Sequence, residues 1–158
     1  MKSASLKEIK TALETLTADE CAALILRLAK FKKENKESIT YWLFESHDET
    51  AYVAGVCSMI DQLFDEVNTD SLYYAKKTIR KIIRVASRYA KYSEKDSTEV
   101  ELLIYVCMKF KALGLDLNKS QVMKNMYTSL LKKINKSVAQ MHEDLQYDYH
   151  HQLNKLEL

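Results

Sequence analysis

A run of cations between Asp70 and Glu94 has the clearest potential for binding chemistry in this sequence. The segment carries seven Lys and Arg side chains and no Asp or Glu. At about 100° per residue, six of them fall within an arc of about 100° on one helix. These six residues are called the basic face below: Lys77, Arg80, Lys81, Arg84, Arg88 and Lys91. Like charges one turn apart repel by about a few tenths of a kcal/mol per pair, so something usually compensates for such a face.

Three sources of compensating negative charge are open. The first is the preceding helix of the same chain, with Asp61, Asp65 and Glu66. The second is a protein partner, and the third is the phosphates of a nucleic acid, which cations bind with release of counterions. A charge run is most often a solvated or internally paired face. Aromatic side chains beside the cations would favour a nucleic acid, and four tyrosines flank the segment: Tyr73, Tyr74, Tyr89 and Tyr92.

The remaining polar clusters do not match a known catalytic pattern. Asp144, Asp148 and His151 follow one another at i, i+4 and i+7, a geometry that suits a divalent metal, but no HExxH or paired ExxH motif accompanies them. His47 stands alone beside Asp48. A phosphate-binding loop needs clustered glycines, whereas the two glycines of this chain are far apart. We therefore expect no enzyme activity, no metal site and no cofactor, and a solvent-exposed C-terminal face.

The composition predicts an all-α fold that positions the basic face on a helix. The 158 residues are 47% apolar and 29% charged, with no proline and only two glycines, the usual punctuation of sheets. Ser5 with Glu8, and Thr17 with Glu20, have capping-box spacing and predict helices over 6–16 and from residue 18 onward. Residues 32–38 are expected to form a turn or a frayed helix end. A third, short helix is expected to carry Ile39, Trp42, Leu43 and Phe44. Asp48 is expected to cap a fourth helix, and the basic face lies on a fifth over 72–92.

The centre of the fold is expected in a sixth helix, capped by Thr98 and apolar nearly all round. Helices two, four and six should supply much of the core, helix two through an apolar face that begins at Cys21 and ends at Phe31. Apolar positions from Met123 to Leu156 recur with a helical period. One helix over 119–156 would be roughly 57 Å long, more than a compact domain spans, so it either projects or breaks near residues 135–137.

The cellular setting is predicted from charge, hydropathy and cysteine. The net charge of +2 does not by itself indicate a polyanionic partner, so any electrostatic function must come from local clusters of charge. No signal peptide is visible at the start, and the longest apolar run, 102–108, is too short to cross a bilayer. Three widely spaced cysteines, Cys21, Cys57 and Cys107, are typical of small buried side chains in a reducing compartment. These features predict a cytoplasmic protein without membrane association.

Three segments resemble a family of small bacterial proteins of unknown function. They are Thr78–Arg84, Glu99–Tyr105 and Leu28–Glu37, which together with their surroundings cover about half of the chain. None of them is a catalytic signature. The resemblance implies an α–α superhelical fold similar to HEAT-type repeats, and it implies no particular activity.

These observations lead to one prediction of architecture and function. The chain is expected to form a single helical domain over 1–158, with 137–158 as a projecting or separately packed C-terminal helix. Its fold is expected to be an irregular antiparallel array of six to eight helices, similar to a short HEAT-like superhelix. Such broad faces bind macromolecules more readily than they enclose substrates. We therefore expect a non-catalytic interaction module with a protein partner at the basic face, and nucleic-acid binding as the alternative; the oligomeric state stays open.

Overall fold

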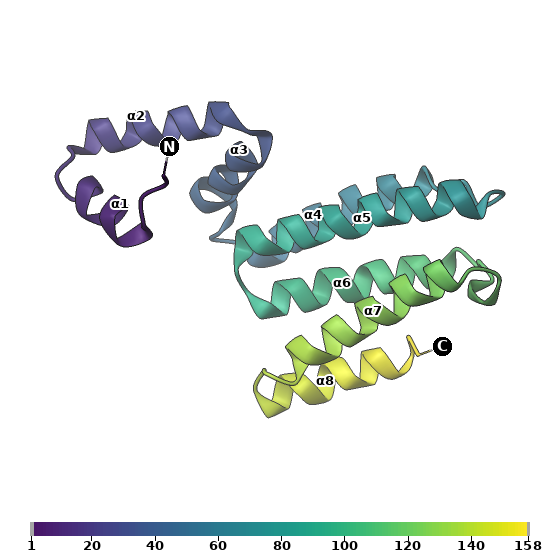
Figure 1. Ribbon diagram of the computed structural model, residues 1–158. Coiled ribbons are helices and arrows are strands. Elements are labelled where there is room, and N and C mark those ends of the chain that lie inside the picture. The colour runs from purple at the N-terminus through teal and green to yellow at the C-terminus, as the bar shows by residue number, and fades with distance from the viewer. Residues whose placement is uncertain (1, 158) are drawn as a thin grey trace. The chain divides into compact units, whose positions relative to one another are not determined.

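A computed structural model of the chain describes residues 2–157, and every regular element in them is helical (Figure 1). The α-helices are α1 (Leu6–Leu13), α2 (Ala18–Phe31), α3 (Lys33–Thr40), α4 (Glu49–Asp65), α5 (Leu72–Ser93), α6 (Asp96–Ala112), α7 (Gln121–Val138) and α8 (Glu143–Asn154). A π-helical turn covers Tyr41–Glu45 and a 3₁₀ turn covers Leu117–Lys119. The prediction of an all-α helical array is confirmed.

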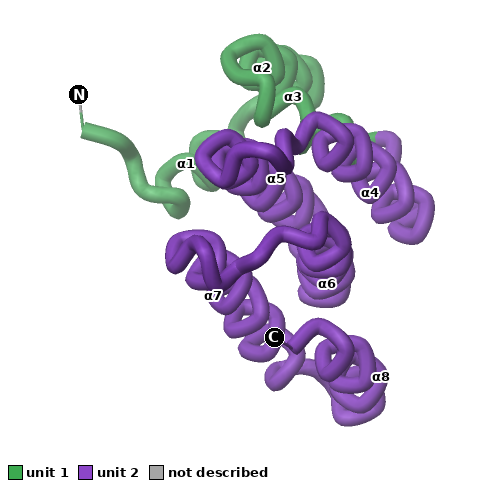
Figure 2. Tube along the Cα trace, turned by 90° about the vertical axis from the view of Figure 1, so that its right-hand side faces the viewer, with its two compact units in different colours: residues 1–43 green, residues 44–158 purple. Residues whose placement is uncertain are grey.

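The helices divide into two compact units, residues 1–43 and residues 44–158, which Figure 2 distinguishes by colour. The first unit contains α1 to α3, and the second contains α4 to α8. Compact units of this kind can belong to one domain, so the single domain over 1–158 stays a prediction. The basic face lies on α5, entirely within the second unit.

Local signals set the helix starts of the first unit. Both capping boxes form as predicted: Ser5 and Glu8 exchange hydrogen bonds at the start of α1, and Thr17 and Glu20 do so at the start of α2. The expected turn or frayed helix end over 32–38 was wrong, because residues 33–40 form α3. The Asn35 side-chain amide donates to the Leu28 carbonyl at 2.9 Å and so ties α3 to α2.

The first unit contributes almost nothing to the buried core. No residue of α1, α2 or α3 is buried, and apolar side chains of α2 such as Leu26 and Phe31 are 62% and 76% exposed. The expectation that helix two supplies core was therefore wrong. Its apolar pattern is helical, but periodicity does not reveal whether another element covers the face.

A fragment that comprises residues 44–158 is expected to fold without the first unit. All buried apolar side chains of the described residues except Tyr41 lie in this range, and burial of apolar surface is the main force that stabilises a fold. Circular dichroism should show a helical fragment with one cooperative thermal transition. A fragment that melts without cooperativity would show that the second unit needs residues 1–43.

The second unit is a stack of consecutive antiparallel helices around α6 (Figure 1). As predicted, α6 is buried on nearly all sides, and α4, α5 and α7 pack against it. Its fully or almost fully buried side chains include Leu102, Leu103, Val106 and Phe110. The predicted N-cap was wrong: α6 begins at Asp96, and Thr98 lies inside it, 1% exposed.

The C-terminal segment breaks into two helices, and α8 folds back. The break lies at residues 139–142, slightly after the predicted one at 135–137. The Tyr127 hydroxyl of α7 donates to the Leu156 carbonyl at 2.7 Å, and Lys111 Nζ donates to the carbonyls of Lys155 and Glu157 at 3.0 and 2.9 Å. These bonds give partners to the carbonyls of the C-cap residue of α8 and of the two residues after it. Residues 143–154 form α8, and the assignment of 137–158 to a projecting or separately packed C-terminal helix stays a prediction.

The buried Tyr127 hydroxyl predicts a loss of stability in alkali. Burial raises the pKa of Tyr127 to about 12, whereas an unfolded tyrosine titrates near about 10. The folded state then holds the proton longer, so the stabilisation is complete below about pH 10 and is lost as the pH rises toward about 12. Urea unfolding at pH 8, 9.5 and 10.5 should show this decline. A Tyr127→Phe variant should decline less steeply, and identical slopes would assign the loss to other groups.

Candidate functional site

Helix α5 presents the basic face because its apolar residues recur on the opposite side. Ala75, Ile79, Ile82, Ala86 and Ala90 are buried against the rest of the second unit. Their spacing of three or four residues places them on one stripe, and the cations between them must then point outward. The helix ends where Glu94 adopts a left-handed backbone with φ of 57°.

Five of the six basic-face residues are exposed, and Arg88 is half-buried. Among the described residues 2–157, no ion pair or hydrogen bond of Lys77, Arg80, Arg84 or Lys91 with an acidic side chain is formed. Lys81 differs, because its Nζ lies 3.5 Å from Glu66 Oε2; both side chains are more than half exposed, so this pair contributes about 0–1 kcal/mol. The guanidinium of Arg88 lies 5.6 Å from the centre of the Tyr89 ring.

The acids predicted to neutralise the basic face, Asp61, Asp65 and Glu66, form no ion pair with Arg80 or Arg84 in the part of the chain that the structure describes. Asp61 turns to α6, where Tyr105 Oη donates to both of its carboxylate oxygens at 2.7 Å and Lys109 Nζ lies 2.7 Å away. The hydrogen bond from Lys109, followed by the one from Tyr105, lowers the pKa of Asp61. Glu66 contacts Lys81 only, and Asp65 forms no ion pair within the described chain. The first of the three alternatives was neutralisation by these acids. Of the six cations of the basic face, they form an ion pair with Lys81 alone.

The tyrosines near α5 divide into two groups. Tyr92 is buried, and Tyr89 is half-buried with its carbonyl bound by the Tyr52 hydroxyl at 2.8 Å. Neither offers an open aromatic surface. Tyr73 and Tyr74, at the start of α5, are 67% and 58% exposed and pack edge to face at 5.4 Å.

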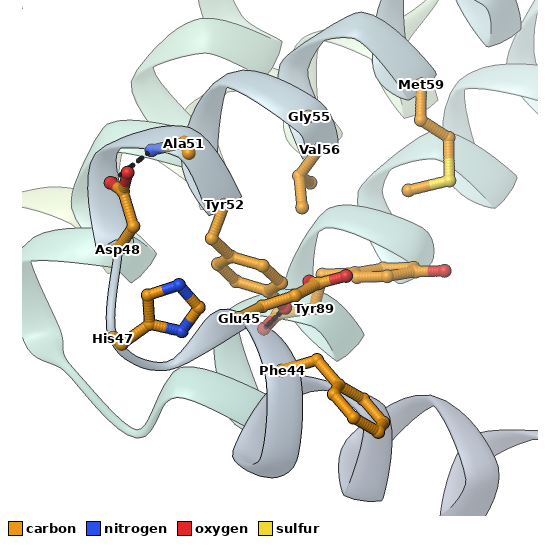
Figure 3. Close-up of a pocket in the computed structure, with 10 residues that line it drawn as sticks. All are labelled: Phe44, Glu45, His47, Asp48, Ala51, Tyr52, Gly55, Val56, Met59 and Tyr89. Atoms are coloured by element: carbon orange, nitrogen blue, oxygen red, sulfur yellow. Dashed lines mark hydrogen bonds between the residues drawn. The ribbon is translucent and has the colours of Figure 1, made fainter.

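A hollow of about 490 Å³ lies beside the start of α4 (Figure 3). Its lining is mainly apolar, and His47 is its one imidazole. Asp48 does not orient that ring: its carboxylate caps α4 by accepting from the Ala51 amide at 2.9 Å, as the dashed line in Figure 3 shows. A general base needs a partner that fixes its tautomer, and this arrangement supplies none.

The C-terminal histidines do not converge on a ligand. Asp144, Asp148 and His151 are exposed, and Asp144 instead approaches His142 Nδ1 at 3.3 Å. No group of three or more His, Cys, Asp or Glu side chains within residues 2–157 could hold a metal ion.

Two of the three cysteine thiols, those of Cys57 and Cys107, are poorly suited to nucleophilic chemistry. All three are free; burial raises the pKa of Cys107 to about 12, and burial followed by the negative charge of Asp61 raises the pKa of Cys57. The thiolate is the reactive form, and these surroundings disfavour it.

Comparison with known protein families, curated proteins and solved structures finds no match for this chain. The resemblance to a small bacterial family therefore stays a prediction. No helix among the described residues is long and apolar enough to span a bilayer.

Sequence reasoning placed the basic face on one helix but missed what lies beside it. Val122 and Met126 of α7 form a second apolar row next to the buried row of Met123, Tyr127 and Leu130. The signal was visible as apolar residues at i and i+4 outside the main stripe. Which helix would lie opposite this row could not be read from the sequence.

Proposed function

We propose that this chain is a non-catalytic interaction module that binds an acidic surface of a protein partner through the basic face of α5. The observation that carries the proposal is the exposure of Arg80 and Arg84 without an acidic partner among the described residues. They lie one turn apart, so they repel each other in the isolated chain. An acidic partner removes this repulsion and forms charge-assisted hydrogen bonds with both guanidinium groups.

The architecture of the second unit supports the same proposal. Consecutive antiparallel helices stack from α4 to α8 (Figure 1), which is the arrangement that a short HEAT-like array would have, and such arrays bind macromolecules on broad faces. The free cysteines, Cys21, Cys57 and Cys107, support a reducing compartment such as the cytoplasm.

Nucleic-acid binding is the second candidate, and the exposed pair Tyr73 and Tyr74 favours it. Both rings lie within about one turn of Lys77, so bases could stack on them while Lys77 contacts a phosphate. Tyr89 and Tyr92 add nothing to this candidate because neither is open.

Fluorescence anisotropy with labelled polyanions tests the proposal. The probes are a polyglutamate peptide and single- and double-stranded DNA and RNA, each titrated at several salt concentrations. An Arg80→Glu/Arg84→Glu variant reverses the two open charges. The matched control, Lys132→Glu/Lys136→Glu, makes the same change one turn apart on exposed positions of α7, and circular dichroism checks that both variants remain helical.

The proposal expects polyglutamate binding that weakens steeply with salt, is lost in the α5 variant and survives in the α7 control. DNA or RNA binding at least tenfold tighter than polyglutamate, with the same dependence on Arg80 and Arg84, would transfer the function to the nucleic-acid candidate. Absence of binding to every probe at low salt would overturn both.

A further inference from the structure

The open arginines border an apolar groove between α5 and α7. Both helices pack on α6, which Figure 2 shows to one side of the pair. The hollow between them has a volume of about 600 Å³ and opens to solvent. Its apolar lining is Ile83 from α5 with Val122, Met126 and Leu130 from α7. We call this surface the α5–α7 groove.

The two walls of the groove differ in charge. Arg80 and Arg84 line the α5 wall and meet no acid in the described structure. The α7 wall carries the neutral side chains Asn125 and Ser129. Lys133 also lines it, but its charge is compensated by Glu99 Oε1 at 2.6 Å. Free positive charge therefore lies along one wall only.

This asymmetry specifies the chemistry of an occupant. Its inner face must be apolar to cover Ile83, Val122 and Met126. One flank must carry carboxylates about 6 Å apart, since Arg80 and Arg84 are four residues apart on a helix. The other flank must be polar and uncharged. An amphipathic helix meets all three conditions. Its acids at i and i+4 have the same spacing along the helix as Arg80 and Arg84. Its apolar residues at i, i+3 or i+4 and i+7 form a stripe that fills a groove between two helices.

We infer that the α5–α7 groove binds an acidic amphipathic helix of a protein partner, with its carboxylates on Arg80 and Arg84 and its apolar stripe on α7. This inference rests on the proposed function and specifies its partner. An acidic amphipathic helix fits the groove better than an extended polyanion does. A phosphate backbone has no apolar face to cover Val122, which is 41% exposed. A small hydrophobic acid would occupy part of the groove but would leave one of the two arginines without a carboxylate.

The test uses the full chain and three designed helical peptides of roughly 18 residues, labelled with fluorescein. The first has leucines at i, i+4, i+7 and i+11 and glutamates along one flank of that stripe. The second replaces the glutamates with glutamine, and the third replaces the leucines with alanine. Polyglutamate serves as the probe of charge alone, and a hydrophobic carboxylate such as dodecanoate serves as a competitor.

Two variants and two controls locate the site. Arg80→Gln/Arg84→Gln removes the charged wall, and its control Lys77→Gln/Lys91→Gln removes two charges of the basic face that do not line the groove. Val122→Gln/Met126→Gln makes the floor polar, and its control is Met108→Gln, a 52% exposed methionine on α6. None of these positions is fully buried, so each variant should keep its helix content.

The inference expects the first peptide to bind at least about tenfold more tightly than the other two and than polyglutamate, a difference of about 1.4 kcal/mol. Both groove variants should weaken it about tenfold or more, and both controls should change it less than about twofold. If polyglutamate binds through Arg80 and Arg84 but the leucines add no affinity, the inference fails and the proposed function stands. If neither the peptides nor polyglutamate bind, both fail. If polyglutamate binds but the first peptide does not, and dodecanoate displaces polyglutamate, the inference fails and the groove is assigned to a small acidic ligand.

Discussion

Replacement of Leu103 with alanine is expected to lower the free energy of unfolding by about 2–5 kcal/mol, the cost of a cavity in a core that collapses only partly. Leu103 lies in the middle of α6 and is 0% exposed. Helices α4, α5 and α7 all pack on α6, so few neighbours are free to move into the space. Urea unfolding monitored by circular dichroism measures the change in free energy, which is large beside the about 5–15 kcal/mol that typical domains possess.

The matched control for this substitution is Met108→Ala, a similar truncation on the same helix at a position that is 52% exposed. It should cost less than about 1 kcal/mol, since an exposed side chain leaves no cavity. Equal losses for the two variants would contradict the central place of α6 in the core. The comparison also bears on the binding experiments, because the groove keeps its shape only while α6 holds α5 and α7 in place.

Replacement of Glu49 with alanine should lower the free energy of unfolding by about 2–4 kcal/mol, since it removes charge-assisted bonds and leaves buried donors unpaired. The carboxylate of Glu49, at the start of α4, accepts from Ser93 Oγ at 2.5 Å, from Thr98 Oγ1 at 2.6 Å and from Lys95 Nζ at 2.7 Å. Thr98 is 1% exposed, so water cannot readily replace its lost acceptor. The three bonds join the start of α4 to the last residue of α5, to the turn after it and to the first turn of α6.

Two further variants separate this cluster from a general loss of charge. Glu49→Gln keeps one accepting oxygen and should lose about half as much as Glu49→Ala. Glu66→Ala removes a carboxylate whose partner Lys81 is exposed, and should change stability by less than about 1 kcal/mol. Denaturant midpoints compare all three variants at one pH. A Glu49→Ala protein as stable as Glu66→Ala would show that the cluster contributes no more than a surface pair.

Helix starts that depend on neighbouring residues were predicted well. The Ser5 and Thr17 capping boxes and the Asp48 cap of α4 all match the structure. Each depends on residues within one turn of the helix end, so the sequence already contains both partners of the interaction.

Two of the wrong predictions concern residues whose partners are distant in sequence. Thr98 has the spacing of a cap with Glu101, but its hydroxyl is bound by Glu49, 49 residues away, and α6 begins two residues earlier. Asp61 has the position of a counter-ion for α5, but Tyr105 and Lys109 of α6 hold it instead. A carboxylate goes to the partner that three-dimensional packing brings closest, and helical periodicity alone does not identify that helix.

The sequence by itself determined an all-α array, a central apolar helix and six cations on one face of α5, because helical period and capping are local properties of the chain. Only the tertiary structure decided that Arg80 and Arg84 stay open and that Val122 and Met126 lie opposite them. The physical reason is that the packing of α5 and α7 on a common helix sets their separation. That separation is set by side chains in the core, so the types and spacing of the exposed residues on α5 and α7 do not predict it.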